Sequence, residues 1–565
     1  MTTILLTALL AVATPATPDE RADVLLFAPR IHTVDPQQPA AEFVAWRDGR
    51  IVAVGPREQG EAWRARAESV LEAPLGSCIV PGFIDSHAHL FAIGHALREL
   101  DLNGTRDYAE VIARVAERAA REPAGRFLRG RGWDQNDWPE TRFPHHAELS
   151  RATPDHPVVL QRVDGHALLC NARALQLAGI DERTVAPAGG EIVRDDHGVP
   201  TGVLIDRACD LVTAVLPPPA ADEEREALAL AQQACAEHGI TSLHDAGIGR
   251  ERLALLQAAA DAGSLTVRLH EMLDGDDAAL LEEWFARGPW RHPGGFLAVR
   301  AVKVYADGAL GSRGAWLLEE YADRPGHRGL SLIGSEELVA LGTRALRAGF
   351  QLCTHAIGDA ANRQVLDAYE RVLRGGSDAT GGVARDVRWR IEHAQLLAPA
   401  DVPRFAALGV VASMQSCHAT SDAPWVPARI GAARAESEAY VWRTLLASGA
   451  RLCNGTDAPV EPLSPLRNLA AAQTRQDPDG STEGDRASSA FFAAQCLTGR
   501  EALASATASG AHAAFREDEL GVLRVGACAD LVLLSADPTA LTATSWRSVK
   551  VLRTFVAGRT VHALD

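Results

Sequence analysis

The chain of 565 residues contains almost no lysine. Of its 56 basic residues only two, Lys303 and Lys550, are lysine, and the rest are arginine. Arginine carries a positive charge at least as reliably, so a lysine in this background suggests chemistry that needs a primary amine. The presence of Lys550 is equally well explained by chance. A functional role for Lys303 is inferred from the residues around it.

The sequence also lacks the marks of several protein classes. A net charge of −17 without a basic patch makes nucleic acid an unexpected partner. No apolar run reaches the roughly 18 residues of a stable membrane span. There is no P-loop, GxGxxG or GxSxG motif, which argues against nucleotide chemistry and against a serine hydrolase. The hydrophobic content of 47% is that of an ordinary globular protein with a large core.

Cysteine pairs are absent as well. The nine cysteines are scattered without a CxxC motif, which predicts buried free thiols rather than a disulfide framework.

Residues 2–16 (TTILLTALLAVATPA) are apolar and precede polar TPDE, a pattern typical of a secretory segment cleaved near Ala13 or Ala16, although Lys and Arg are missing before it. Residues 1–21 are therefore predicted to be a signal peptide of an exported, periplasmic protein; if they are not cleaved, the protein is expected in the cytoplasm.

Short alternating runs with turns mark both ends of the chain. They cover residues 22–80, where Asp48 and Gly49 form a hairpin signal, and residues 516–565. Because the two ends have the same character, we expect them to form one small β-sandwich domain.

Between the ends, residues 81–515 alternate between strand and helix patterns. Eight such units predict an α/β fold, a (β/α)8 TIM-like barrel. The gap between the first and second strands is far too long for a loop and predicts a large insertion, at about residues 100–240, over the barrel mouth. The eight expected strands are 79–85, 242–245, 267–273, 301–307, 351–357, 388–393, 410–415 and 451–457.

Metal-binding residue types recur where these strands end, which is where barrels of this kind carry their chemistry. The first strand runs into VPGFIDSHAHL, and alternate residues of a strand share a face, so both histidines can point inward. The residues at these strand ends are His87, His89, Lys303, His355, His393 and Asp457.

Four histidines and an aspartate at one mouth predict a divalent metal centre. Imidazole and carboxylate suit Zn²⁺ best, with Mn²⁺, Fe²⁺ and Co²⁺ as alternatives. One histidine among 19 means little, but the joint pattern on strands one, five, six and eight is specific. A desolvated Lys303 can add CO₂ to give a carbamate that bridges two metals; the alternative is an ion pair with Asp307 or a neighbouring acid.

The chain resembles the amidohydrolase superfamily, and within it the YtcJ-like group that includes N-substituted formamide deformylases. The resemblance spans nearly all of residues 22–565 and implies that the six residues above form the metal centre, with Lys303 carbamylated. One departure is Ser416 in SMQSCH, where related chains tend to have proline. The most specific stretches are IVPGFIDSHAHL, GRGWDQNDW, VDGHALLCNARAL, GITSLHDAG, VKVYADGALGSRGA, THAIGDAAN, RIEHAQ, NGTDAP and GVLRVGACADLVLLSADP.

Four further residues in family-like motifs are predicted to line a substrate pocket, with plain packing as the alternative for each. They are Trp133, His166, Asp307 and His418.

The predicted activity is hydrolysis of an amide or another non-peptide carbonyl carbon–nitrogen bond in a small molecule. Two divalent cations, with Zn²⁺ as the first choice, would activate water, and Asp457 would carry the proton as the catalytic residue. Two alternatives stay open: a mononuclear deaminase of the same superfamily, which would not need Lys303, and an exported metal- or solute-binding protein without turnover. The oligomeric state is also open, with a homodimer as one alternative.

Overall fold

The computed structural model describes residues 21–135, 138–162, 167–187, 190–311, 313–379, 386–476 and 490–564. The predicted secretory segment lies outside these residues. The chain divides into two compact units, one made of the residues up to Leu90 together with Gln232–Asp565, the other of Phe91–Ala231. Within the described residues, no helix has both the length and the apolar character needed to cross a membrane.

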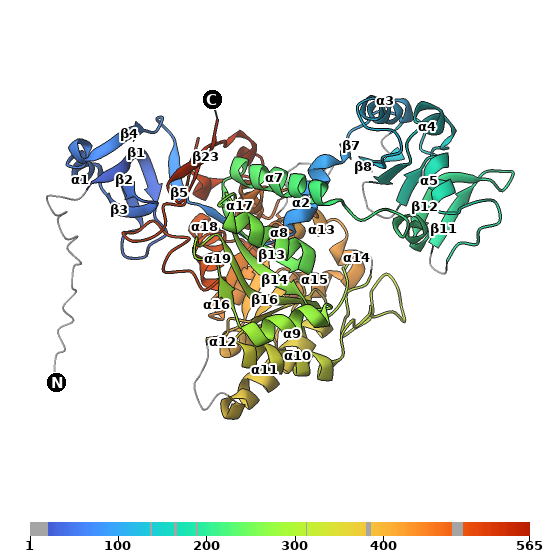
Figure 1. The fold of residues 1–565 in the computed structure, drawn as a ribbon. Coiled ribbons are helices and arrows are strands. Elements are labelled where there is room, and N and C mark those ends of the chain that lie inside the picture. The colour runs from blue at the N-terminus through green and yellow to red at the C-terminus, as the bar shows by residue number, and fades with distance from the viewer. Residues whose placement is uncertain are drawn as a thin grey trace. The chain divides into compact units, whose positions relative to one another are not determined.

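The two ends of the chain form one eight-stranded sheet (the end sheet), and its blue N-terminal and red C-terminal strands lie together in Figure 1. Seven strands follow the order β23-β22-β21-β5-β1-β2-β3, and β4 pairs with β1. Asp48 and Gly49 connect β2 to β3 with φ values of 51° and 74°, the left-handed pair that a tight hairpin requires. The strands are β1 (Ala22–His32), β2 (Ala40–Arg47), β3 (Arg50–Gly55), β4 (Ala67–Glu72), β5 (Cys78–Pro81), β21 (Leu531–Leu534), β22 (Val551–Val556) and β23 (Arg559–Ala563).

Eight parallel strands form a nearly closed barrel, which confirms the predicted fold class. They are hydrogen-bonded in the order β20-β19-β18-β17-β16-β14-β13-β6, and short β15 (Trp290–Arg291) adds antiparallel to β16. The barrel strands are β6 (Phe83–Ala88), β13 (Ile240–Ile248), β14 (Arg268–Asp274), β16 (Leu297–Tyr305), β17 (Gln351–Ala356), β18 (Arg390–His393), β19 (Val411–Met414) and β20 (Arg451–Asn454).

The first expected strand, 79–85, is two strands in the structure. β5 belongs to the end sheet and β6 to the barrel, and the chain passes between them at Gly82. A Cβ at Gly82 would lie 2.1 Å from Thr241 Oγ1, so only glycine allows the chain to pass this close to β13. The apolar run hides this change of sheet because both strands are buried.

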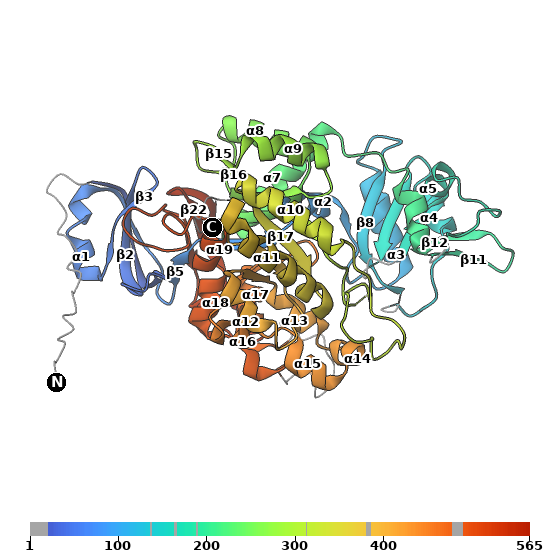
Figure 2. The same cartoon turned by 90° about the horizontal axis from the view of Figure 1, so that it is seen from below.

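Helices pack on the outside of the barrel; α10 and α11, for example, lie beside β17 (Figure 2). α10 ends at Gly349, whose left-handed conformation turns the chain back into β17. The helices of eight or more residues in this unit are α8 (Arg250–Asp261), α9 (Ala278–Arg287), α10 (Ser335–Ala348), α11 (Asp359–Ala379) and α17 (Pro465–Thr474). The shorter ones are α1 (Arg57–Glu61), α12 (Val402–Leu408), α13 (Ser416–Asp422), α14 (Val426–Ile430), α15 (Ala432–Glu438), α16 (Trp442–Ala447), α18 (Gly499–Ser505) and α19 (Ala508–Ala513), with 3₁₀ turns at Arg64–Arg66, Ala493–Gln495, Pro538–Ala540 and Ser545–Ser548.

The second unit is the insertion between β6 and β13. α2 (Leu90–Arg98) leads into it and α7 (Ala221–Glu237) leads out. Its six-stranded sheet has the order β11-β12-β10-β9-β8-β7 and its own apolar core. Its elements are β7 (Leu100–Asp101), α3 (Tyr108–Ala119), β8 (Leu128–Trp133), α4 (Ala147–Ala152), β9 (Val158–Arg162), β10 (Ala167–Cys170), α5 (Ala172–Leu177), β11 (Gly190–Arg194), β12 (Pro200–Asp206), a 3₁₀ turn at Arg207–Cys209 and α6 (Asp210–Thr213).

Candidate metal centre

The two histidines of the opening motif meet the aspartate that follows the last barrel strand. Nε2 of His87 lies 3.5 Å from Asp457 Oδ1, and Nε2 of His89 lies 3.2 Å from the same oxygen. Burial raises the pKa of Asp457, but the neighbouring imidazoles outweigh it and hold that pKa well below its usual range. The carboxylate is therefore ionised in the folded protein.

Backbone hydrogen bonds close the barrel at this point. The Asp457 amide donates to the His87 carbonyl at 2.7 Å, and the His89 amide donates to the Ala458 carbonyl at 2.9 Å. A Cβ on Gly455 would lie 2.4 Å from the His87 nitrogen, so the glycine allows the two chain segments to approach. The first and last strands thus present their polar residues to one another at a fixed spacing.

Two further histidines extend the row of imidazoles beside His87. The His355 and His393 rings are 4.5 Å apart, and the His393 and His87 rings are 4.9 Å apart. His393 Nδ1 lies 2.7 Å from Gln415 Oε1, which leaves Nε2 as its ligand atom. His87, His393 and Asp457 each offer a ligand atom, and these atoms lie within 4.8 Å of one another.

Lys303 is buried beside the same group. It is 2% exposed, and its Nζ lies 3.4 Å from His87 Nε2 and 4.6 Å from the centre of the Tyr305 ring. Burial lowers the pKa of this amine, so the neutral form that reacts with CO₂ is easier to reach than at the surface. The structure thus brings all six sequence-predicted residues together, while ligation itself stays a prediction.

A buried ion pair that the sequence analysis missed holds His87 in place. His87 Nδ1 lies 2.5 Å from Glu392 Oε2, so the ring can donate to the carboxylate and keep Nε2 free as a ligand atom. Arg390 Nε lies 2.7 Å from the other oxygen of Glu392, and neither side chain is exposed. The sequence feature that could have predicted this pair is the alternation of charged and apolar residues in RWRIEH. Charged residues at every second position of a barrel strand share one face.

The donor set fits a divalent cation. Nε2 of His355 and Oδ1 of Asp457 are buried and make no hydrogen bond within the described ranges. A buried polar atom without a partner costs free energy, and bound cations would satisfy such atoms. Imidazole nitrogen and carboxylate oxygen are ligands that Zn²⁺ and its neighbours accept.

The four residues predicted to bind substrate have different surroundings. His418, in α13, lies at the centre: its Nε2 is 3.7 Å from Asp457 Oδ2 and its ring stacks 5.9 Å from His393. Trp133 is wholly buried in the core of the insertion and donates its indole N–H to the Leu160 carbonyl, so packing accounts for it. His166 lies outside the described residues.

Asp307 is buried behind His355 rather than open to a ligand. It accepts the backbone N–H groups of Trp316, Ile357 and Gly358 at 2.8–2.9 Å, and its Oδ1 lies 3.6 Å from His355 Nε2. Burial raises its pKa to about 7 despite these hydrogen bonds. The carboxyl group thus fixes the loops after β16 and β17 and, through them, the position of His355.

Ser416 joins the seventh and eighth strands. Its amide donates to Asn454 Oδ1 at 3.1 Å, and the Asn454 side-chain amide donates to its hydroxyl at 2.7 Å. Proline could provide neither the amide hydrogen nor the hydroxyl. The serine therefore supplies a cross-strand link at this mouth that a proline would remove.

Comparison with known proteins gives the same picture. The model of the Amidohydrolase family matches residues 76–562. The chain is 30% identical to the putative amidohydrolase YtcJ of Bacillus subtilis (strain 168), covering 94% of this chain and 98% of that protein. It is 29% identical to the N-substituted formamide deformylase of Arthrobacter pascens, over 95% and 97% of the two chains. The crystal structure of an uncharacterized metal-dependent hydrolase from Pyrococcus horikoshii OT3 matches with a TM-score of 0.74 at 25% identity, covering 92% of this chain and 99% of that one.

Proposed function

This chain belongs to the amidohydrolase family and is a metal-dependent hydrolase of carbon–nitrogen bonds; from that premise we propose that it cleaves the amide of a small N-substituted formamide or a related carbonyl compound at a centre of two Zn²⁺ ions. The convergence of six potential ligands at the C-terminal ends of the barrel strands carries the proposal: His87, His89, Lys303, His355, His393 and Asp457. The relative from Arthrobacter pascens supports the choice of formamides as the first substrates to test.

The ligands would divide between the ends of several strands. His87, His89 and Asp457 form one group, His355 and His393 another, and a carbamylated Lys303 between them would bridge the two ions. Divalent cations bound there supply two effects, a lowered pKa of water and polarisation of the substrate carbonyl. The alternative, a single ion on His87, His393 and Asp457, would leave Lys303 as a buried amine without a role in catalysis.

Proton transfer falls to Asp457 in this proposal. Its carboxylate is ionised at neutral pH, lies at the centre of the group and has one oxygen without a hydrogen bond in the described part of the chain. It can take the proton of the attacking water and return it to the leaving amine. Glu392 and Arg390 act behind His87 by fixing the orientation of its ring.

A panel of amides tests the proposal. The wild-type protein, assayed with N-substituted formamides, acetamides and cyclic amides, should release amine from at least one class. Asp457→Asn should retain near-normal metal content and fold while its turnover number falls by at least about 10², the lower end for loss of acid–base catalysis. The matched control is Asp274→Asn: this carboxylate at the end of β14 accepts from the Asp276 amide, and its loss should leave turnover unchanged.

Three results would contradict the proposal. Asp457→Asn with near wild-type turnover would remove Asp457 from the proton-transfer step. Activity that falls only in proportion to lost metal would make Asp457 a ligand and nothing more. An absence of amine release across the panel by metal-replete protein would refute the substrate class.

A further inference from the structure

A second group of potential metal ligands lies in the end sheet, separate from the barrel centre. His32 is the last residue of β1, Cys78 is the first residue of β5, and Asp537 follows β21. Ile31 pairs with Ile79, and Leu534 pairs with Cys78, so the three chain segments are neighbours in the sheet. Their ligand atoms lie within 4.8 Å of one another.

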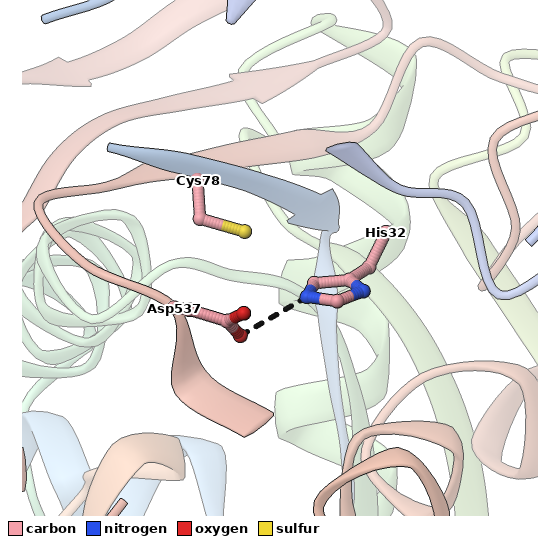
Figure 3. Close-up of side chains that lie close together, drawn as sticks. All are labelled: His32, Cys78 and Asp537. Carbon is pink, nitrogen blue, oxygen red and sulfur yellow. Dashed lines mark hydrogen bonds and ion pairs between the residues drawn. The ribbon is translucent and has the colours of Figure 1, made fainter. Parts of the chain in front are cut away.

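The three side chains face a common point. His32 Nε2 lies 3.0 Å from Asp537 Oδ1, and the sulfur of Cys78 points into the space beside this pair (Figure 3). Cys78 is 1% exposed, whereas the side chains of His32 and Asp537 are 16% and 21% exposed. An ion from solvent can therefore reach the imidazole and the carboxylate, and the thiol lines the buried side of the same site.

The geometry suits a tetrahedral ion. With bonds of about 2.0–2.3 Å to nitrogen, oxygen and sulfur, the ligands of a tetrahedral zinc lie about 3.3–3.8 Å apart. His32 and Asp537 are slightly closer than this, at 3.0 Å, and all three ligand atoms lie within 4.8 Å of one another, so small side-chain rotations suffice to close the site. Thiolate, imidazole and carboxylate together favour a borderline-soft cation over Mg²⁺ or Ca²⁺.

We propose that His32, Cys78 and Asp537 bind a zinc ion that links the N-terminal strands of the end sheet to its C-terminal strands. Water fills the fourth position, because the site has three protein ligands. On binding, the S–H bond of Cys78 breaks, its proton goes to solvent and the sulfur bonds to zinc. The ion joins segments about 500 residues apart in the sequence, and its three ligands are not among the residues of the barrel centre.

The alternative is a hydrogen-bonded cluster without metal. Asp537 already accepts from Arg30 Nη1 at 2.5 Å, from the Thr539 amide at 2.9 Å and from its hydroxyl at 2.7 Å. Burial, aided by the charge of Asp537, raises the pKa of the Cys78 thiol to about 12, so zinc must compete with a firmly held proton. Zinc binding should accordingly tighten as the pH rises, whereas a metal-free cluster predicts no such dependence.

Cobalt provides the test, because a thiolate bound to Co²⁺ gives a near-ultraviolet charge-transfer band that histidine, carboxylate and carbamate ligands do not. Metal-free full-length protein is titrated with Co²⁺ while its absorption spectrum is recorded. Wild type should develop the band, Cys78→Ser should lose it, and added Zn²⁺ should suppress it in wild type. Two buried cysteines serve as controls. Cys528→Ser, near the end sheet, and Cys453→Ser, in the barrel, should both keep the charge-transfer band.

Circular dichroism establishes that each variant is folded. If Cys78→Ser does not fold, His32→Gln replaces it; this variant keeps a donor for Asp537 and should weaken the cobalt affinity reported by the band at least tenfold. A wild-type protein that shows no band at saturating Co²⁺ overturns the proposal, as does a band that survives in Cys78→Ser or an unchanged affinity in His32→Gln. None of these readouts depends on amide hydrolysis, so the result stands apart from the proposed function.

Discussion

Removing the charge of Glu392 should cost both stability and metal affinity. The side chain is wholly buried between His87 and Arg390. Although burial opposes ionisation, the charge of the Arg390 guanidinium and the hydrogen bond with His87 hold its pKa well below the usual range. In Glu392→Gln an amide replaces the carboxylate without a change in size. The Arg390 guanidinium then stays buried without a counter-charge, and the amide hydrogens have no acceptor on that side.

The size of the expected loss of stability depends on the hydrogen bonds that Arg390 retains in the variant. Breaking a buried ion pair costs about 3–5 kcal/mol. Arg390 keeps hydrogen bonds to the Ser86 carbonyl, the Ser413 hydroxyl and His244 Nδ1, so we expect the lower end, about 3 kcal/mol. For a folding unit of about 400 residues this lowers the melting temperature by on the order of 4 °C. Loss of the partner that orients His87 should weaken metal binding by about 10- to 100-fold.

Glu271 offers a matched control in the same barrel. It too is wholly buried, in β14, and pairs in register with Asp245 of β13. Burial and the adjacent Asp245 raise the pKa of Glu271 well above its usual range, so its protonated form is favoured. Gln has the shape and donor of a protonated Glu, so Glu271→Gln should leave metal affinity unchanged and should not destabilise the protein at neutral pH.

The two variants should also differ in their pH dependence. A depressed pKa in the folded state means that Glu392 stabilises the fold above the unfolded-state pKa of about 4.5, and that this contribution fades as the pH falls toward the folded value. A raised pKa in the folded state has the opposite effect on stability. The contribution of Glu271 to the stability of the fold therefore declines as the pH rises above about 4.5. The deficit of Glu392→Gln should therefore shrink in acid, and Glu271→Gln should gain on wild type toward alkaline pH.

Melting temperatures between about pH 3 and pH 8, with metal affinity from competition against a chelator, measure both effects. Equal behaviour of the two variants would refute the reasoning, because it would mean that Glu392 and Glu271 share one ionisation state. Unchanged metal affinity in Glu392→Gln would show that the carboxylate does not orient His87.

Three further outcomes are expected. Protein purified without added metal or chelator should contain near two equivalents of zinc for the barrel centre in a Cys78→Ser background, as read by elemental analysis; near zero after reconstitution would contradict the two-ion centre. Lys303→Ala should lose most activity and bind metal more weakly, with partial rescue by short carboxylic acids, whereas full activity in Lys303→Arg would exclude the carbamate, since guanidinium cannot carry CO₂ in this way. N-terminal sequencing of protein from the native host should begin near Thr14 or Thr17, and a soluble cytoplasmic protein that retains Met1 would show that the segment is not a cleaved signal.

The sequence predicted the barrel well because its strands end in polar motifs that punctuate apolar runs. His87, Lys303 and Asp457 were predicted as site residues in this way, by residue type and by position at a strand end. Ion pairs within the barrel were harder to foresee, because the partner of His87 is about 300 residues away and its approach depends on the closed barrel. Alternation also fails at His393, where a φ of 72° turns the side chain to the same side as Glu392, so strand periodicity alone would have pointed it outward.

The hydrogen bonds between His87, His89 and the segment after β20 have a consequence for synthesis. Residues 87 and 89 leave the ribosome some 370 residues before Asp457 and Ala458. The backbone hydrogen bonds between the two segments can therefore form only after the later segment has been synthesised. A nascent chain therefore carries no working centre until most of its length has emerged. During the same interval β5 exposes the edge that β21 later covers, and an uncovered strand edge invites pairing with other chains. The closed architecture that protects the finished enzyme leaves the growing chain dependent on rapid completion or on a chaperone.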